Sequence, residues 1–87
     1  MNNSSAASLP TPDDRLDLRG TPCPLNFVRT KLRLQKLPPG QLLEVWLDPG
    51  DPIEQVPDSL HAAGYPVAAI VNCGNYFALQ VRQSTAV

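Results

Sequence analysis

Prolines and glycines divide this chain into short segments, and their positions limit its fold more than any other feature of the sequence. They cluster at residues 20–22, 38–40, 48–52 and 64–66, and a Cys-Gly pair lies at 73–74. Proline cannot continue a helix interior, and glycine adopts the backbone conformations that turns require. The 87 residues are therefore expected to form one small domain of short helices and strands.

Hydrophobic periodicity assigns a type to each segment. Alternation predicts strands at residues 15–18, 42–48, 66–72 and 75–82, the last two joined through residues 73–74 as a hairpin. A helix is predicted over 24–37, with Pro24 in its first turn. A shorter helix is predicted to begin at Val56 or Pro57 and to run to Ala63, with Gly64 as its stop. Residues 48–52 are predicted to be a turn.

The resulting order is β-α-β-α-β-β. Strands joined through helices are normally parallel with right-handed crossovers, whereas a hairpin is antiparallel. Two helices can cover only one face of the four-stranded mixed sheet, which predicts an α/β fold, an α+β two-layer sandwich. The other face is expected to be open and to carry Glu44, Trp46 and Tyr76. The domain is predicted to span 14–83, between a disordered N-terminal tail at 1–13 and a short C-terminal tail at 84–87.

Composition argues against several classes of protein. A net charge of −1 disfavours direct binding of nucleic acid. No apolar run approaches the ~18 residues of a membrane-spanning helix, and the N-terminus lacks the basic and apolar regions of a secretory signal. The two cysteines, without a C-x-x-C spacing, indicate neither a disulfide scaffold nor a zinc site. We therefore expect a cytoplasmic monomer with no metal site and no membrane association.

The charged residues are unevenly distributed. Five of the eight acids lie between positions 44 and 58, and six of the seven basic residues lie between positions 15 and 36: Arg15, Arg19, Arg29, Lys31, Arg33 and Lys36. One interpretation is a pair of solvated faces. The other is a positive field around Cys23 that favours its thiolate and an acidic partner.

Cys23 lies between two prolines at the predicted start of the first helix, where it is expected to be the N-cap. The first N–H groups of a helix have no partner inside the helix, and cysteines placed there near cations are activated as thiolates. Pro24 would fix the first turn, the backbone N–H of Asn26 would point at the sulfur, and Arg19 and Arg29 would add positive charge. The alternative is a small apolar filler, which needs none of this arrangement.

The segments LDLRGTPCPLN, LLEVWLDPGDP and VPDSLHAAGY resemble the TusA/SirA-like family of small sulfur carriers over about residues 15–83. The resemblance implies a two-layer sandwich with strand order 1-2-4-3. It implies that Cys23 accepts a persulfide sulfur from a protein donor such as a cysteine desulfurase and relays it to an acceptor protein, as in tRNA thiolation. The implied activity is of the sulfurtransferase type, with the covalent persulfide as the carried group and no other cofactor.

One departure from the family pattern lies beside the cysteine. Asn26 occupies the place of the family's second proline, so that the motif is C-P-L-N. An additional N–H near the sulfur should support an anion at least as well, so the thiol chemistry is expected to persist. The departure also leaves open a second function, a non-catalytic adaptor or regulatory module that docks a partner through the first helix. Reactivity of Cys23 distinguishes the two.

The first helix has two apolar stripes. Phe27, Thr30, Leu34 and Leu37 have the spacing of a sheet-facing stripe. The second stripe consists of Leu25, Val28 and Leu32. It either packs sideways on the second helix or forms an exposed docking strip that begins near Cys23 and is flanked by Arg29, Lys31 and Arg33.

Four further residues have weaker assignments. Asp48 and Asp51 follow the second strand. They either orient a partner or donate a proton or, as favoured here, cap the turn and the helix. Strand order 1-2-4-3 places Cys73 about 14 Å from Cys23 at ~4.8 Å per strand, beyond the ~7 Å Cα separation of a disulfide. Cys73 is thus predicted to have no resolving role, and His61 to lie on the surface.

Overall fold

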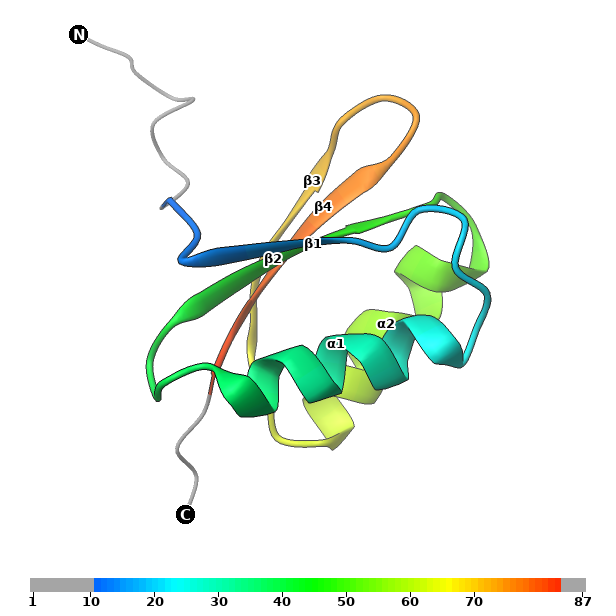
Figure 1. The fold of residues 1–87 in the computed structure, drawn as a ribbon. Coiled ribbons are helices and arrows are strands. Elements are labelled where there is room, and N and C mark those ends of the chain that lie inside the picture. The colour runs from blue at the N-terminus through cyan, green and yellow to red at the C-terminus, as the bar shows by residue number, and fades with distance from the viewer. Residues whose placement is uncertain (1–10, 84–87) are drawn as a thin grey trace, which may run out of the picture.

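The computed structural model describes residues 11–83 and contains the predicted succession of elements (Figure 1). Residues 1–10 of the predicted N-terminal tail and the whole predicted C-terminal tail lie outside the described residues. Asp13 already pairs with the sheet, since its N–H donates to the Leu42 carbonyl at 2.8 Å. The elements are β1 (Asp14–Asp17), α1 (Leu25–Lys36), β2 (Leu42–Leu47), α2 (Asp51–Ala62), β3 (Val67–Asn72) and β4 (Phe77–Arg82).

The four strands form one mixed sheet in the order β1-β2-β4-β3. β1 is parallel to β2, whereas β4 runs antiparallel to both β2 and β3. Within residues 11–83, both helices lie on one side of the sheet and the opposite side carries none (Figure 1). The predicted two-layer sandwich is confirmed. In the described part of the chain, neither helix is long and apolar enough to cross a membrane.

The core lies between the sheet and the helices. Alternate residues of β2 point into it, and Leu43 and Val45 face Val81 and Leu79 of β4 across the sheet. Such alternation is the pattern expected of a sheet with one covered face. The core cluster of buried side chains consists of Leu18, Leu34, Leu43, Val45, Leu47, Val56, Leu60, Leu79 and Val81.

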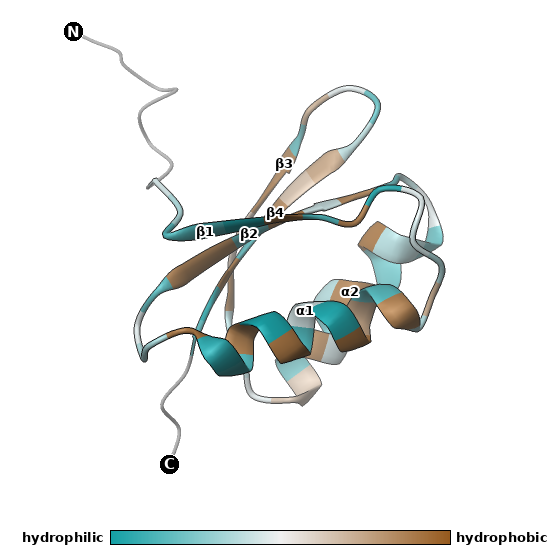
Figure 2. Ribbon diagram, in the orientation of Figure 1, coloured by the Kyte–Doolittle hydropathy of each residue, from teal (hydrophilic) through white to brown (hydrophobic). Residues whose placement is uncertain are grey.

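The two faces of α1 differ as the sequence predicts, and apolar and polar residues alternate along it in Figure 2. Thr30 and Leu34 are buried, while Phe27 and Leu37 pack against the core. Thr30 is accommodated there because its hydroxyl donates to the Asn26 carbonyl at 2.8 Å. The second stripe is exposed, so the alternative in which it packs on α2 is wrong. The exposed fractions are 41% for Leu25, 42% for Val28 and 54% for Leu32.

The second helix is longer than predicted. It begins at Asp51 rather than at Val56 or Pro57, so the last part of the predicted 48–52 turn is helical. Pro52 lies in the first turn, where proline needs no N–H partner, and the acidic Asp51 suits the positive end of the helix dipole. Pro57 consequently lies inside the helix instead of starting it. The predicted glycine stop is confirmed, since Gly64 has a φ of 92°.

The segments that surround Cys23 lie together at one end of the molecule. The carboxyl ends of β1 and β2 and the amino ends of α1 and α2 all lie at this end (Figure 1). The loop before α1 is fixed to the end of β2, because the Gly20 N–H donates to Asp48 Oδ2 at 2.6 Å. The parallel pairing of β1 with β2 therefore brings the Cys23 loop beside residues 48–50.

Candidate functional site around Cys23

Cys23 is exposed in the loop that leads into α1. The N-cap of α1 is Pro24 and not, as predicted, Cys23. The hydrogen bonds place the start of the helix, since the N–H of Val28 donates to the Pro24 carbonyl at 3.0 Å. The Cys23–Pro24 peptide bond is cis. The cysteine thus lies one residue before the cap, at the amino end of the helix and open to a partner.

Asn26 contacts the sulfur, but through a different group from the one predicted. Its backbone N–H donates to the Pro22 carbonyl at 3.1 Å, and its side-chain Nδ2 donates to Cys23 Sγ at 3.2 Å. The carboxamide oxygen accepts from the Phe27 N–H at 2.7 Å. Asn26 has no solvent exposure. Because both ends of the carboxamide are bonded and the residue is buried, the N–H donor is held in a fixed position beside an exposed thiol.

Asp48 binds the loop before α1 and not, as predicted, its own turn or the start of α2, which has no side-chain cap hydrogen bond. Its carboxylate accepts the Gly20 N–H across 28 positions of chain, and Gly20 has a φ of 82°, a backbone conformation that favours glycine. A further turn bond, from the Thr21 N–H to the Leu18 carbonyl at 3.0 Å, shapes the same loop. Asp51 is exposed at the first position of α2, where its charge complements the helix dipole.

Arg19 does not lie where the sequence placed it. Its guanidinium pairs with Asp17 at 2.8 Å and stacks 5.0 Å from the ring centroids of both Trp46 and Tyr76. Hydrogen bonds from Arg19 lower the pKa of Asp17 to about 2. The Arg19 side chain lies on the open face of the sheet. Its charge therefore interacts with Asp17 and with the two aromatic rings.

Arg29 is also separate from the sulfur. It is exposed on α1 and lines a groove beside β1. Within residues 11–83, no hydrogen bond or ion pair joins Arg29 or Arg19 to Cys23. Of the residues predicted to support the thiol, the structure brings Pro24 and Asn26 to it and places both arginines elsewhere.

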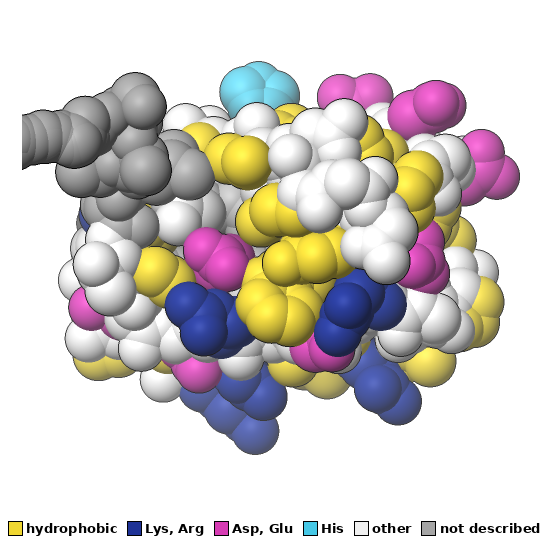
Figure 3. All heavy atoms as spheres, turned by 90° about the horizontal axis from the view of Figure 1, so that it is seen from above, with side chains coloured by type: hydrophobic (Ala, Val, Ile, Leu, Met, Phe, Trp, Pro, Cys, Tyr) yellow, Lys and Arg dark blue, Asp and Glu magenta, His cyan; other side chains and the backbone are white. Residues whose placement is uncertain are grey.

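The open face of the sheet carries an aromatic and cationic cluster that sequence reasoning found only in part. Figure 3 shows this face, with hydrophobic side chains in the middle and basic ones on either side. Trp46 packs on Tyr76 at 5.1 Å and donates from Nε1 to Glu44 at 2.8 Å. Arg15 pairs with Glu44 at 3.3 Å and lies over the Trp46 ring. The predicted positions of Glu44, Trp46 and Tyr76 on the open face are confirmed. The sequence could also have placed Arg15 there, because Arg15 alternates with the partly buried Leu16 along β1.

Cys73 lies in the hairpin between β3 and β4, and its N–H donates to the Tyr76 carbonyl at 2.9 Å. Both cysteines are free and exposed. His61 is exposed, as predicted. Among residues 11–83, no group of three or more histidine, cysteine or acidic side chains is placed to hold a metal ion.

Comparisons with known proteins point in one direction. Residues 14–83 match the family model described as "Sulfurtransferase TusA". A Thermotoga maritima protein named "Putative sulfur carrier protein" is 41% identical over 59 residues, 68% of this chain and 75% of that protein. The Escherichia coli K12 protein named "Putative sulfur carrier protein YedF" is 38% identical over 63 residues, 72% of this chain and 82% of that protein.

A solved structure shows the same fold. The SirA-like protein from Desulfitobacterium hafniense superposes with a TM-score of 0.69 at 18% identity, covering 82% of this chain and 97% of that one. At this identity the likeness concerns the fold alone. It agrees with the strand and helix order described above.

Proposed function

Because the chain belongs to the TusA sulfurtransferase family, we propose that it carries sulfur as a persulfide on Cys23. The sulfur comes from a protein donor of the cysteine desulfurase type and passes to an acceptor protein. The observation that supports this assignment best is the hydrogen bond from the buried Asn26 side chain to the exposed Cys23 Sγ. A cysteine with only a packing role needs neither exposure nor a fixed N–H donor.

The transfer consists of two exchanges at sulfur. In the first, the Cys23 thiolate attacks the terminal sulfur of the donor persulfide, the donor S–S bond breaks, and the donor cysteine leaves as a thiolate. In the second, an acceptor thiolate attacks the terminal sulfur on Cys23, and Cys23 leaves as a thiolate. Electrons and atoms balance without an added oxidant or reductant.

The Asn26 amide acts on the same atom in both exchanges. Cys23 Sγ bears negative charge before it attacks and again as it leaves, and an N–H donor stabilises a charged acceptor more than a neutral one. Because the amide is buried and bonded at its oxygen, it need not reorganise in either step. Asn26 is therefore a positioning residue for the sulfur, in the place where the family pattern has a proline.

The donor and acceptor are proposed to dock on the apolar strip, which comprises Leu25, Val28 and Leu32. These large side chains are exposed on the helix that begins directly after Cys23. Lys31 and Arg29 lie beside them and give the strip a basic rim. An apolar centre with a charged rim is the usual composition of a protein interface. Asp48 contributes to docking by fixing the loop that presents the thiol. Asp51 contributes a negative charge at the start of α2.

A loading experiment tests the function. The protein is incubated with a cysteine desulfurase and cysteine, and its intact mass is then measured. We expect a gain of one sulfur atom in the wild type and in Cys73→Ser, and no gain in Cys23→Ser. If none of the three proteins gains sulfur while a partner still binds α1, the adaptor function replaces the carrier function.

A further inference from the structure

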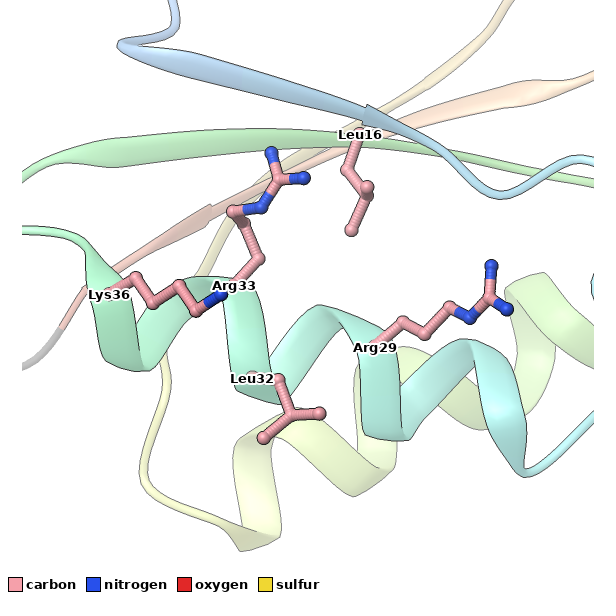
Figure 4. A pocket seen from close by; sticks show the side chains of 5 residues that line it. All are labelled: Leu16, Arg29, Leu32, Arg33 and Lys36. Carbon is pink, nitrogen blue, oxygen red and sulfur yellow. The ribbon is translucent and has the colours of Figure 1, made fainter.

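A second surface feature lies on the flank of α1, between that helix and β1. It is a groove of about 250 Å³. In Figure 4, Leu16 points from β1 toward α1, and the side chains of Arg33 and Arg29 rise from α1 on either side of it. The groove is lined by Leu16, Arg29, Leu32, Arg33 and Lys36. It therefore combines an apolar base with three cations. Cys23 does not line it, and it shares Leu32 and Arg29 with the apolar strip and its rim.

The charge in this groove is only partly compensated. Arg33 pairs with Asp14 of β1 at 2.9 Å. The other oxygen of that carboxylate accepts the Arg15 N–H at 2.8 Å, and these bonds, chiefly the one from Arg33, lower the pKa of Asp14. Within residues 11–83, Arg29 and Lys36 form no ion pair. The groove thus presents two uncompensated cations, one at each end of its apolar base.

One wall of the groove is a sheet edge. β1 is the terminal strand of the order β1-β2-β4-β3, so only one of its sides is paired by a strand of the described chain. A groove between an edge strand and a helix accommodates a peptide in extended conformation, because the peptide can lie along the strand while its side chains contact the helix. This shape favours an extended chain over a compact ligand.

We propose that the groove between β1 and α1 binds an extended acidic segment of a partner protein. An apolar side chain of the segment rests on Leu16 and Leu32, and two flanking carboxylates pair with Arg29 and Lys36. These two cations are seven residues apart in α1, about 10.5 Å along its axis. Carboxylates four residues apart in an extended chain are about 13 Å apart, a difference that flexible side chains bridge. The matching pattern is acid-x-apolar-x-acid.

Asp14 provides an internal model of the interaction. Its carboxylate accepts hydrogen bonds from the Arg33 guanidinium and from a backbone N–H of β1. These are the two kinds of donor, a side-chain cation and a backbone N–H, that an acidic segment would meet. Replacing it by asparagine removes a negative charge from the groove and frees Arg33 for the ligand, while the amide oxygen can still accept from Arg15. Asp14→Asn should therefore strengthen binding, whereas a purely structural role for Asp14 predicts no gain.

The test uses a fluorescein-labelled peptide, Ser-Glu-Thr-Leu-Thr-Glu-Ser with blocked ends, and fluorescence anisotropy at low salt. We expect saturable binding that weakens about tenfold in Arg29→Glu and tightens in Asp14→Asn. Lys31→Glu is the matched control, because it makes the same charge change on α1 outside the groove. It should alter binding by less than about twofold. A peptide with lysine in place of both glutamates should not bind.

The proposal does not depend on sulfur transfer, and Cys23→Ser should bind the peptide as the wild type does. Equal losses in Arg29→Glu and Lys31→Glu would reduce the effect to general electrostatics and overturn the groove assignment. So would unchanged or weaker binding in Asp14→Asn, or absence of saturable binding. If the protein instead self-associates and Arg29→Glu abolishes that association, the occupant is a second copy of this chain and not an acidic segment.

Discussion

The side chain of Asn26 donates a hydrogen bond to the sulfur of Cys23 across 3.2 Å, from a helix position with no solvent exposure. The two residues are three positions apart, so that they lie close together at the turn that begins α1. One is open to partners and the other is fixed in the core. The proposed carrier thus has its sulfur at the surface and, beside it, an amide donor that is shielded from water.

The first prediction concerns the donor itself. Asn26→Leu fills a similar volume but has no N–H to offer, so alkylation of Cys23 at neutral pH should slow by about tenfold, the equivalent of one lost charge-assisted bond. The rate is measured with iodoacetamide in a Cys73→Ser background.

Thr30→Val is the matched control for that experiment. It also alters a buried polar residue of α1, since the Thr30 hydroxyl donates to the Asn26 carbonyl. It should lower the free energy of unfolding without slowing alkylation. If Asn26→Leu leaves the alkylation rate unchanged, the amide does not support the sulfur.

A second prediction restores the proline of the family pattern. The sequence alone predicts that Asn26→Pro is tolerated, because proline suits the first turn of a helix. The structure adds a cost, since the Asn26 N–H donates to the Pro22 carbonyl. We expect a folded protein that is about 1 kcal/mol less stable in urea unfolding, the value of one such bond. Its alkylation rate should fall to that of Asn26→Leu. A loss of several kcal/mol would mean that residue 26 has a larger structural role.

The third prediction separates the two faces of α1. Leu25 is 41% exposed, so Leu25→Asp should change the free energy of unfolding by about 0.5 kcal/mol or less. It should nevertheless abolish sulfur loading by the desulfurase. Leu34 has no exposure, and Leu34→Ala should cost about 2–5 kcal/mol. Thermal unfolding and the loading assay are run on both variants, and normal loading of Leu25→Asp would exclude the apolar strip as the docking surface.

The fourth prediction follows from the pairing of Asp17 with Arg19. The pKa of Asp17 is lowered to about 2 from 3.8, so the pair stabilises the native state above about pH 4, and this contribution is lost as the pH falls toward 2. Arg19→Gln should raise the Asp17 pKa in an NMR titration, because the guanidinium bonds are lost while the backbone N–H of residue 19 still donates to the carboxylate. It should leave sulfur loading unaffected, because Arg19 lies on the open face. Impaired loading would restore Arg19 to the cysteine site.

Helices and strands were predictable wherever the hydrophobic periodicity ended at a proline or a glycine. β2 alternates cleanly, and prolines 38 and 39 end α1 where expected. The start of α2 was not predictable in this way, because three prolines lie between positions 49 and 57 and the last of them, Pro57, resembles a first-turn proline although it lies mid-helix.

Only part of the geometry of the candidate site was predictable from the sequence. Cys23, Pro24 and Asn26 follow from the motif. The group of Asn26 that reaches the sulfur depends on side-chain geometry, which sequence spacing does not specify. Arg19 was misplaced because closeness in sequence does not determine on which side of a sheet a side chain emerges, and here Asp17 and the ring of Trp46 hold it on the open face.

The most direct measurement of the central claim lets both cysteines compete within one molecule. Wild-type protein is loaded by a desulfurase with cysteine, cleaved under non-reducing conditions, and the added sulfur is located by fragmentation mass spectrometry. Both thiols are exposed, so access alone does not distinguish them. We predict the added sulfur on Cys23 with Cys73 unmodified. Sulfur on Cys73, or equally on both residues, would contradict the account.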